Sequence, residues 1–305
     1  MRYFIENDVL KAEIDSHGAE LKSVIGKASN REYMWYGNPA YWGRTSPVLF
    51  PFVGNLKEGG YIYKGQKCRM TQHGFARDME FTLKESTGSE IWFSLESNEE
   101  TKSKYPFDFE LMIGYVLDGN KLDVRWKVIN KTEEDMHFSI GAHPAFLCPV
   151  HGEKDKTGYS FALYGSDGKG GYVPASDSIR YHGNSYETGL LLREERDLPV
   201  KNGVITITEG FFDECTYIMQ DQPLNKVSLL DSKGEPVVDV LFDTPLIAIW
   251  SPEKKNAPFV CIEPWYGRCD IEGFDGELAD REYTNHLAKG EEFNKAYSIV
   301  FHAMA

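Results

Sequence analysis

Short stretches in which apolar and polar residues alternate recur along the chain, separated by Gly, Asn, Asp and Pro. The clearest stretch is 121–130, where every second residue from Leu122 to Val128 is apolar and the residues between them are charged. Because successive side chains of a strand point to opposite faces, this pattern predicts a strand with one buried and one solvated face. An Asp-Gly-Asn run at 118–120 is typical of a hairpin turn, which joins this strand to another expected at 111–117.

The same alternation predicts further strands at 203–208, 225–230 and 236–242, with an Asp-Ser-Lys-Gly hairpin turn between the last two. No amphipathic run has caps at both ends, so we expect few and short helices. The stretch 165–185 is rich in Gly, Ser, Asp and Tyr and is expected to form a long loop. The pattern indicates an all-β sandwich or barrel that occupies residues 1–305 as one domain.

Composition narrows the functional classes. The 305 residues are 41% hydrophobic and 13% aromatic, as in an ordinary globular protein. The net charge of −14 opposes a nucleic-acid or anionic-membrane partner, because binding to phosphates requires a basic surface. No apolar run approaches the ~20 residues that span a bilayer, and the first residues resemble neither a signal peptide nor a transit peptide. We therefore expect a cytoplasmic protein with neither kind of partner.

Cysteine usage agrees with that location. The five cysteines are an odd number and show no Cys-x-x-Cys spacing. Such a set argues against a disulfide framework and against a structural zinc site. Reduced thiols in a cytoplasm fit it best.

The stretch 257–267 predicts a buried strand that presents a carboxylate. Glu263 follows Phe259 and Cys261 on one face of an extended chain. Loss of hydration at such a place raises the pKa of a carboxyl group, which suits a general base. Pro264 is expected to end the strand, and Trp265 offers a flat surface for a sugar ring or packs in the core. The plainer alternative for Glu263 is an exposed glutamate beside a turn.

Two histidines have neighbours that suggest a cleft. In 137–146, His143 shares a strand face with small residues, which leaves space above that face; a hydrogen-bonded histidine at a strand end is the alternative. His73 precedes Gly74, which allows a sharp turn. Arg77 follows, and either holds a substrate hydroxyl or pairs with Asp78.

Five short motifs together resemble the aldose 1-epimerase (galactose mutarotase) family, in one of its less typical bacterial branches. Their order and wide spacing along nearly the whole chain carry the resemblance, at 46–54, 73–77, 143–146, 212–214 and 261–265. The resemblance implies a large antiparallel β-sandwich of the galactose mutarotase type, with an open sugar-binding cleft on one concave sheet. It also implies an isomerase that needs no cofactor and no metal, whose partner is a small-molecule sugar, in a monomer or homodimer.

The resemblance further implies a role for each site residue. Interconversion of the α and β anomers of a hexose removes the proton of the C1 hydroxyl and protonates the ring oxygen, so one base and one acid suffice. By position Glu263 resembles the base and His143 the acid, while His73 binds the sugar near the reacting centre. Asp213 is expected to accept from a sugar hydroxyl, or else to be a solvent-facing turn carboxylate.

One position departs from the family pattern. Typical mutarotases carry a sugar-binding arginine where this chain has Asn55. Asparagine has a shorter reach and no charge, so the contact is either lost or transferred to Arg44 or Arg77. This difference affects the prediction of which sugar is preferred more than the prediction of which reaction is catalysed.

Three other functions remain open from the sequence. A metal enzyme would use His73, His143 and Glu263 as a two-histidine, one-carboxylate site, although no His-x-His or His-x-x-x-His spacing supports it. A sugar-binding protein would keep the cleft without turnover. A hexose-6-phosphate 1-epimerase would need a cluster of cations for the phosphate, for which Arg44, Arg77 and Arg268 are available.

Overall fold

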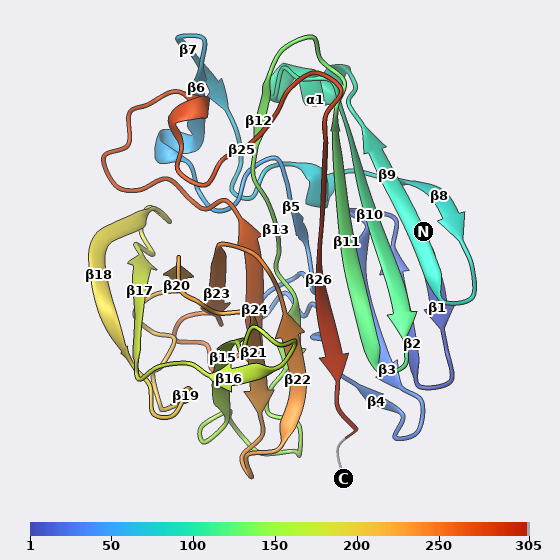
Figure 1. Cartoon of the computed structure of the whole chain (residues 1–305), viewed down its shortest axis with the longest axis vertical. Helices are drawn as coiled ribbons and strands as arrows, with labels where there is room; N and C mark the ends of the chain where they lie inside the picture. Colours follow the sequence, from blue (N-terminus) through green and yellow to red (C-terminus); the bar gives the residue numbers. More distant parts are fainter. Residues whose placement is uncertain (304–305) are drawn as a thin grey trace.

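The computed structural model describes residues 1–303 and consists mainly of antiparallel strands (Figure 1). The strands are β1 (Arg2–Glu6), β2 (Leu10–Asp15), β3 (Glu20–Gly26), β4 (Arg31–Glu32), β5 (Val48–Leu49), β6 (Gly60–Tyr63), β7 (Gln66–Arg69), β8 (Thr82–Ser86), β9 (Glu90–Glu96), β10 (Phe109–Asp118), β11 (Lys121–Asn130), β12 (Met136–Phe138), β13 (Ile140–Ala142), β14 (Ala145–Leu147), β15 (Ser160–Ser166), β16 (Tyr172–Pro174), β17 (Ser178–Asn184), β18 (Leu191–Pro199), β19 (Val204–Thr206), β20 (Tyr217–Gln220), β21 (Lys226–Leu230), β22 (Pro236–Leu241), β23 (Leu246–Trp250), β24 (Phe259–Tyr266), β25 (Asn285–Leu287) and β26 (Glu292–Phe301). Within the described residues, helices are limited to α1 (Glu99–Lys104) and the 3-10 turns η1 (Lys57–Gly59), η2 (Ala76–Asp78) and η3 (Leu278–Asp280). The expectation of few and short helices is confirmed.

Two large sheets form the sandwich. The ten-stranded sheet has the order β16-β15-β21-β22-β26-β11-β10-β9-β8, with β19 beside β15. The eight-stranded sheet has the order β18-β17-β20-β23-β24-β13-β5, with β14 beside β24. A four-stranded sheet, β1 to β4, adds to one end, where Tyr3 packs edge-on against Phe93 of β9. The all-β antiparallel architecture is therefore as predicted.

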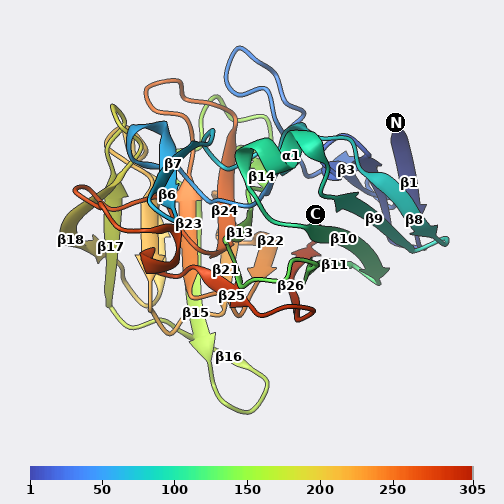
Figure 2. The ribbon, with the colours of Figure 1, turned by 90° about the horizontal axis from the view of Figure 1, so that it is seen from above.

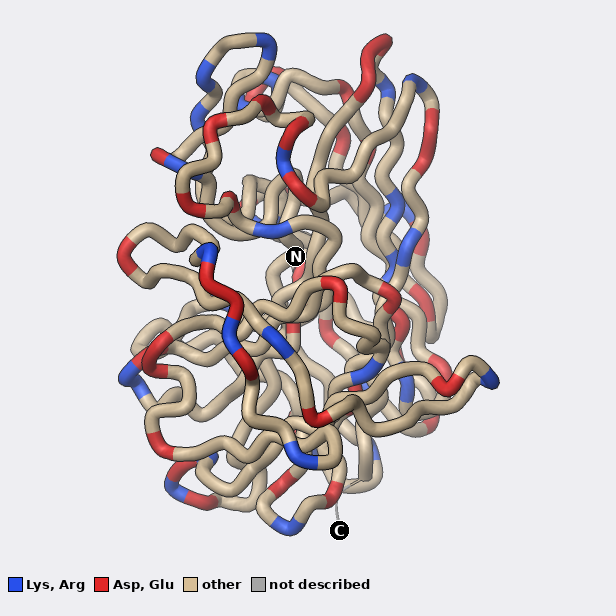
Figure 3. Tube along the Cα trace, turned by 60° about the vertical axis from the view of Figure 1, so that its left-hand side comes forward, with Lys and Arg blue, Asp and Glu red and all other residues tan. Residues whose placement is uncertain are grey.

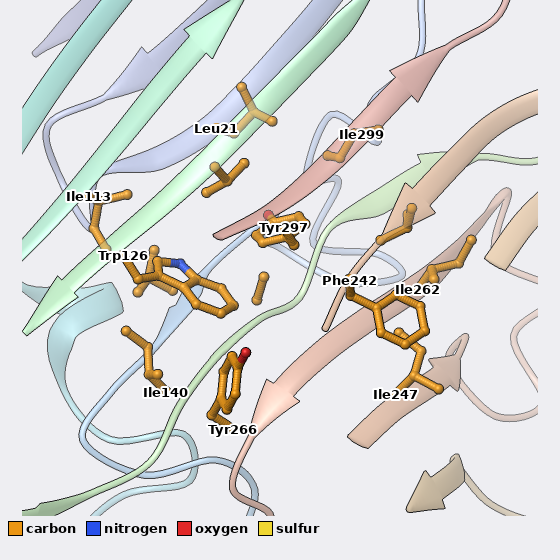
Figure 4. Packing of buried hydrophobic residues seen from close by; sticks show 14 of the residues in the cluster. Leu21, Ile113, Trp126, Ile140, Phe242, Ile247, Ile262, Tyr266, Tyr297 and Ile299 are labelled. Atoms are coloured by element: carbon orange, nitrogen blue, oxygen red, sulfur yellow. The ribbon is translucent and has the colours of Figure 1, made fainter. Parts of the chain in front are cut away.

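The core lies between the two large sheets. Figure 4 shows Trp126 of β11 and Ile299 of β26 facing Ile262 and Tyr266 of β24. Trp126 and Tyr266 meet edge-to-face, with ring centroids 6.3 Å apart. Because β24 is covered on both sides, all eight of its residues are buried. This strand is the rigid centre on which the site depends.

Several predicted strands agree closely with the structure. The 121–130 strand is β11, whose predicted apolar face is buried. It pairs with β10 through the predicted turn at Gly119, whose φ is +58°. The hairpin of β21 and β22 also forms as expected. Pro47 and Pro51 flank β5, which lies at an edge of its sheet, where the missing N–H groups of proline disturb few ladder hydrogen bonds.

Two expectations about local structure were wrong. The stretch 165–185 is not one long loop, because it contains β16 and β17, and its longest irregular part is the Gly-rich turn at 167–171. Figure 2 shows this turn projecting beyond β16. Pairing of β17 with β18 and β20 overrides its loop-like composition. Strand β24 also passes through Pro264, which lies where the ladder changes partner from β14 to β13 and is already interrupted.

Charges are mixed over the surface. Figure 3 shows Lys and Arg interspersed with Asp and Glu along the traced chain. No helix among residues 1–303 is long and apolar enough to cross a membrane.

Candidate active site

The register of two strands brings Glu263 and His143 together. On β24, Cys261 pairs with Ala145 of β14 and Trp265 pairs with Gly141 of β13. Glu263 lies midway between these two pairs and therefore faces His143, which occupies the break between β13 and β14. Opposite residues of antiparallel strands are near neighbours. The Nε2 atom of His143 lies 3.3 Å from Oε2 of Glu263.

Burial changes the proton affinity of both groups. Glu263 is 1% exposed and His143 is 7% exposed. Loss of hydration raises the pKa of the Glu263 carboxyl well above its ordinary value. Loss of hydration, helped by the charge of Arg77, lowers the pKa of His143 to about 3. Both shifts disfavour charge on either partner. At neutral pH the pair therefore shares one proton and carries no net charge.

Neither partner is fully satisfied by the other. Among residues 1–303, Nδ1 of His143 is buried without a hydrogen-bond partner, and Oε2 of Glu263, the atom that faces Nε2 of His143, is buried without a well-aligned hydrogen bond even to that nitrogen. A buried polar atom without a partner costs free energy, and such atoms concentrate where a ligand binds. The pair is thus suited to donating a proton to a bound molecule and accepting one from it.

His73 approaches the pair from a tight turn. Its Nδ1 accepts the N–H of Gly54 at 3.0 Å, so the neutral ring carries its proton on Nε2. Burial, and then the charge of Arg77, lower the pKa of His73 well below its ordinary value and keep the ring neutral. The rings of His73 and His143 are 5.7 Å apart. At Gly74, with φ +70°, a Cβ atom would lie 2.2 Å from the carbonyl oxygen of Phe50.

Two tryptophans pack against the ring of His143, and a third, Trp265, donates a hydrogen bond to the backbone beside it. Trp42 lies nearly parallel to its ring, with centroids 4.7 Å apart and planes at 26°, and Trp250 meets it edge-on at 5.2 Å. Trp265 is 4% exposed, and its Nε1 donates to the carbonyl of Ala142 at 3.2 Å. Trp265 thus packs mainly in the core beneath the cleft. The half-buried Trp42 and Trp250 were not singled out from the sequence. Trp250 follows the apolar run 246–249, whereas Trp42 has no such signal.

These residues line one cleft of about 470 Å³, within the usual size range for small-molecule sites. It contains the predicted residues Glu263, His143, His73, Arg77, Asn55 and Trp265, together with Tyr41, Trp42, Gly54, Gln72, Asn184, Ser185, Tyr186, Gly189, Thr216, Ile218, Trp250, Pro252, Glu253, Lys255 and Cys269. Aromatic rings and hydrogen-bonding groups occur together in this lining, as is typical of sites for sugars.

The three candidate arginines do not form one cluster, because Arg44 and Arg77 both lie beside Asp78 whereas Arg268 lies elsewhere. Arg77 lines the cleft, and its Nε is buried, 3.8 Å from Asp78, with no hydrogen-bond partner among the described residues. Arg44 instead lies outside the cleft lining and pairs with Asp78 at 2.7 Å. Arg268 pairs with Glu282, away from the cleft. A cluster of cations for a phosphate group is thus not formed by these three residues.

Two residues considered for sugar contacts hold a turn or a loop in this structure, which for Asp213 agrees with the alternative of a solvent-facing turn carboxylate. Asp213 is exposed and lines a neighbouring cavity of about 560 Å³. Its Oδ1 accepts the N–H of Lys254 at 2.8 Å, so it holds a turn. Asn55 does line the cleft, but its amide donates to the carbonyl of Thr188 at 3.1 Å. The side chains of Asp213 and Asn55 thus each have a hydrogen-bond partner within the protein.

A possible metal-ligand group coincides with the proton-transfer pair. Among residues 1–303, the ligand atoms of His143, Cys261 and Glu263 lie within 4.8 Å of one another. Burial raises the pKa of the Cys261 thiol well above its ordinary value, so a metal would have to displace a tightly held proton. His73 is outside this group. The arrangement thus fits acid-base chemistry more directly than metal ligation.

Comparison with known proteins establishes the family. The sequence model described as Aldose 1-epimerase matches residues 1–278, and the chain belongs to this family. It is similar to the plasmid-encoded LacX protein of Lactococcus lactis subsp. lactis, with 30% identity over 97% of this chain and 98% of that protein. It is also 21% identical, over 93% of its length and 87% of the relative, to a protein of Escherichia coli (strain K12) named as a candidate glucose-6-phosphate 1-epimerase.

Solved structures show the same fold. A galactose mutarotase related enzyme from Lactobacillus acidophilus superimposes with a TM-score of 0.90 at 35% identity, covering 99% of this chain and 98% of that one. A galactose mutarotase-like protein from Lactobacillus casei also gives a TM-score of 0.90, at 29% identity, covering 99% of this chain and 100% of that one. The fold is thus the galactose mutarotase type of β-sandwich.

Proposed function

We propose that this protein is an aldose 1-epimerase that interconverts the α and β anomers of a hexose without a cofactor. The observation that carries the proposal is the buried pair of Glu263 and His143, 3.3 Å apart at the base of an open cleft. Family membership supports the same class of reaction.

The chemistry follows from the substrate's own geometry. The C1 hydroxyl oxygen and the ring oxygen are both bonded to C1, so an acid and a base that act on them must lie side by side. In the proposed forward step the shared proton starts on His143. Glu263 takes the hydroxyl proton while His143 protonates the ring oxygen, the C1–O bond of the ring opens, and the shared proton ends on Glu263. The carbonyl then turns about the C1–C2 bond, and reverse transfers close the ring on its other face.

Other residues orient the sugar in this proposal. Nε2–H of His73 donates near the reacting centre, and Arg77 donates to a hydroxyl. Trp42 and Trp250 form an apolar wall beside His143. Holding the substrate in one pose supplies much of the rate enhancement of such an enzyme.

Polarimetry tests the proposal. Freshly dissolved α-D-glucose and α-D-galactose should approach the same final rotation faster with the protein than without it, and a chelator should not change the rate. Glu263→Gln and His143→Asn should each lower kcat by roughly a hundredfold or more. No acceleration of either sugar would contradict the proposal, and loss of activity on chelation would favour a metal enzyme.

A hexose 6-phosphate is the second candidate substrate, because Arg77 and Lys255 are cations of the cleft and one relative carries that name. The cleft also contains Glu253, which opposes a phosphate group. We favour the unphosphorylated sugar. Comparison of kcat/KM for glucose and glucose 6-phosphate decides between them. Sugar binding without faster anomer exchange would instead indicate a binding protein.

A further inference from the structure

One wall of the cleft is a short loop at a sheet edge. Residues 185–190 connect β17 to β18, and Ser185, Tyr186 and Gly189 line the cleft. Strand β18 is the outermost strand of its sheet. Edge loops have few neighbours and open at low free-energy cost, so their position depends on particular contacts.

Asn55 makes such a contact from the opposite side. Its Nδ2 donates to the carbonyl of Thr188 at 3.1 Å. The next residue, Gly189, has φ +69°, and a Cβ atom there would lie 2.0 Å from Nδ2 of Asn55. Only glycine permits this approach. The asparagine amide and the loop backbone are therefore packed together as well as hydrogen-bonded.

The other flank of the loop is also held. The hydroxyl of Tyr186 donates to the carbonyl of Phe212 at 2.8 Å, and Oδ1 of Asn184 accepts the N–H of Thr216 at 2.8 Å. Asn55 thus supplies the side-chain contact on the flank nearest His73. Its peptide neighbour Gly54 donates its N–H to that histidine at 3.0 Å. Asn55 and Gly54 therefore connect the 185–190 loop to the turn that carries His73.

We propose that Asn55 is a positioning residue that holds the 185–190 loop closed against the substrate, and that the loop, rather than Asn55, contacts the sugar. One N–H of the Asn55 amide is already used by the carbonyl of Thr188, which fixes the direction of the side chain toward the loop. The hydroxyl of Ser185 accepts the N–H of Thr188 at 3.2 Å, which leaves its own proton for a sugar oxygen. This inference rests on the proposed function only for the identity of the ligand.

The test uses Asn55→Ala, and Asn55→Asp, which keeps the size but loses the donor. Glu187→Ala is the matched control, because Glu187 lies in the same loop but is exposed and outside the cleft. Hydrogen–deuterium exchange of residues 184–190 should rise about threefold to tenfold in both Asn55 variants, as expected for loss of one hydrogen bond, and stay at the wild-type rate in the control. KM for the accepted sugar should rise by a similar factor, with kcat changed less than about twofold.

The two readouts separate the inference from the proposed function. Exchange of the loop is measured without any sugar, so it decides whether Asn55 holds the loop even if no sugar is turned over. Unchanged exchange in both Asn55 variants would overturn the inference. A fall in kcat at constant KM would overturn it too, because it would place Asn55 at the reacting centre.

Discussion

Trp42 lies flat on His143, with ring centroids 4.7 Å apart. The indole covers one face of the imidazole and keeps water from it, which contributes to the burial that lowers the pKa of His143. Trp42→Ala should therefore raise that pKa toward its ordinary value of 6.5 and lower kcat/KM by about tenfold. Trp42→Phe keeps a flat ring and should retain most activity. The acid limb of the pH–rate profile measures the shift, and an unmoved limb in Trp42→Ala would exclude this role for the indole.

The pH dependence of the wild-type rate should show a broad plateau. Activity requires the state in which Glu263 and His143 share one proton. Uptake of a second proton ends the plateau on its acid side, at a pH below the ordinary pKa of histidine, because burial lowers the pKa of His143. Loss of the last proton ends the plateau on its alkaline side, at a pH well above the ordinary pKa of glutamate, because burial raises the pKa of Glu263.

The measurement is kcat/KM from about pH 2.5 to about pH 10, a range that includes the lowered pKa of His143 of about 3, with the uncatalysed rate subtracted. His143→Asn removes one partner and should abolish the plateau. A single limb near the ordinary pKa of histidine, with activity rising on deprotonation, would show that an exposed histidine acts alone.

Glu263→Gln should stabilise the fold although it lowers kcat by roughly a hundredfold or more. The folded-state pKa of this carboxyl is raised, so the folded protein binds its proton more tightly than the unfolded chain does. The resulting destabilisation is absent below the unfolded pKa and grows as pH rises through and above it. At pH 7.5 the variant should gain about 1 kcal/mol or more in free energy of unfolding, since one pKa unit corresponds to ~1.4 kcal/mol.

Urea denaturation of wild type and Glu263→Gln, at about pH 7.5 and about pH 4, measures the difference in free energy of unfolding between the two proteins. The gain should shrink toward zero near pH 4, about the pKa of an unfolded glutamate. A difference that is the same at both pH values would mean that packing, not the charge of Glu263, separates the two proteins.

Gly74→Ala should destabilise the protein and misplace His73. The added Cβ would meet the carbonyl oxygen of Phe50 at 2.2 Å, and φ at this residue is +70°. Strain of this kind costs about 1–3 kcal/mol or more. Gly88→Ala is the control, because nothing lies within 4 Å of a Cβ there. Thermal unfolding should separate the two variants, and equal midpoints would refute the steric argument.

Local pattern was sufficient to predict the class of fold. Alternation along 121–130 correctly gave β11 and its buried face, because strand side chains alternate whatever the rest of the chain does. The same logic predicted that Glu263 is buried in a strand with a raised pKa, as the structure has it. It failed at 165–185, where pairing with distant strands outweighs a loop-like composition.

Only the tertiary structure decided which residues meet. His143 faces Glu263 because β13 and β14 both pair with β24 in one register, which the packing of the two sheets fixes. The stacking of Trp42 and the contact of Asn55 with Thr188 join segments that are far apart in sequence, so no local pattern signals them. The sequence by itself determined the strands and the chemical groups that they carry, whereas long-range strand pairing determined the distances between those groups.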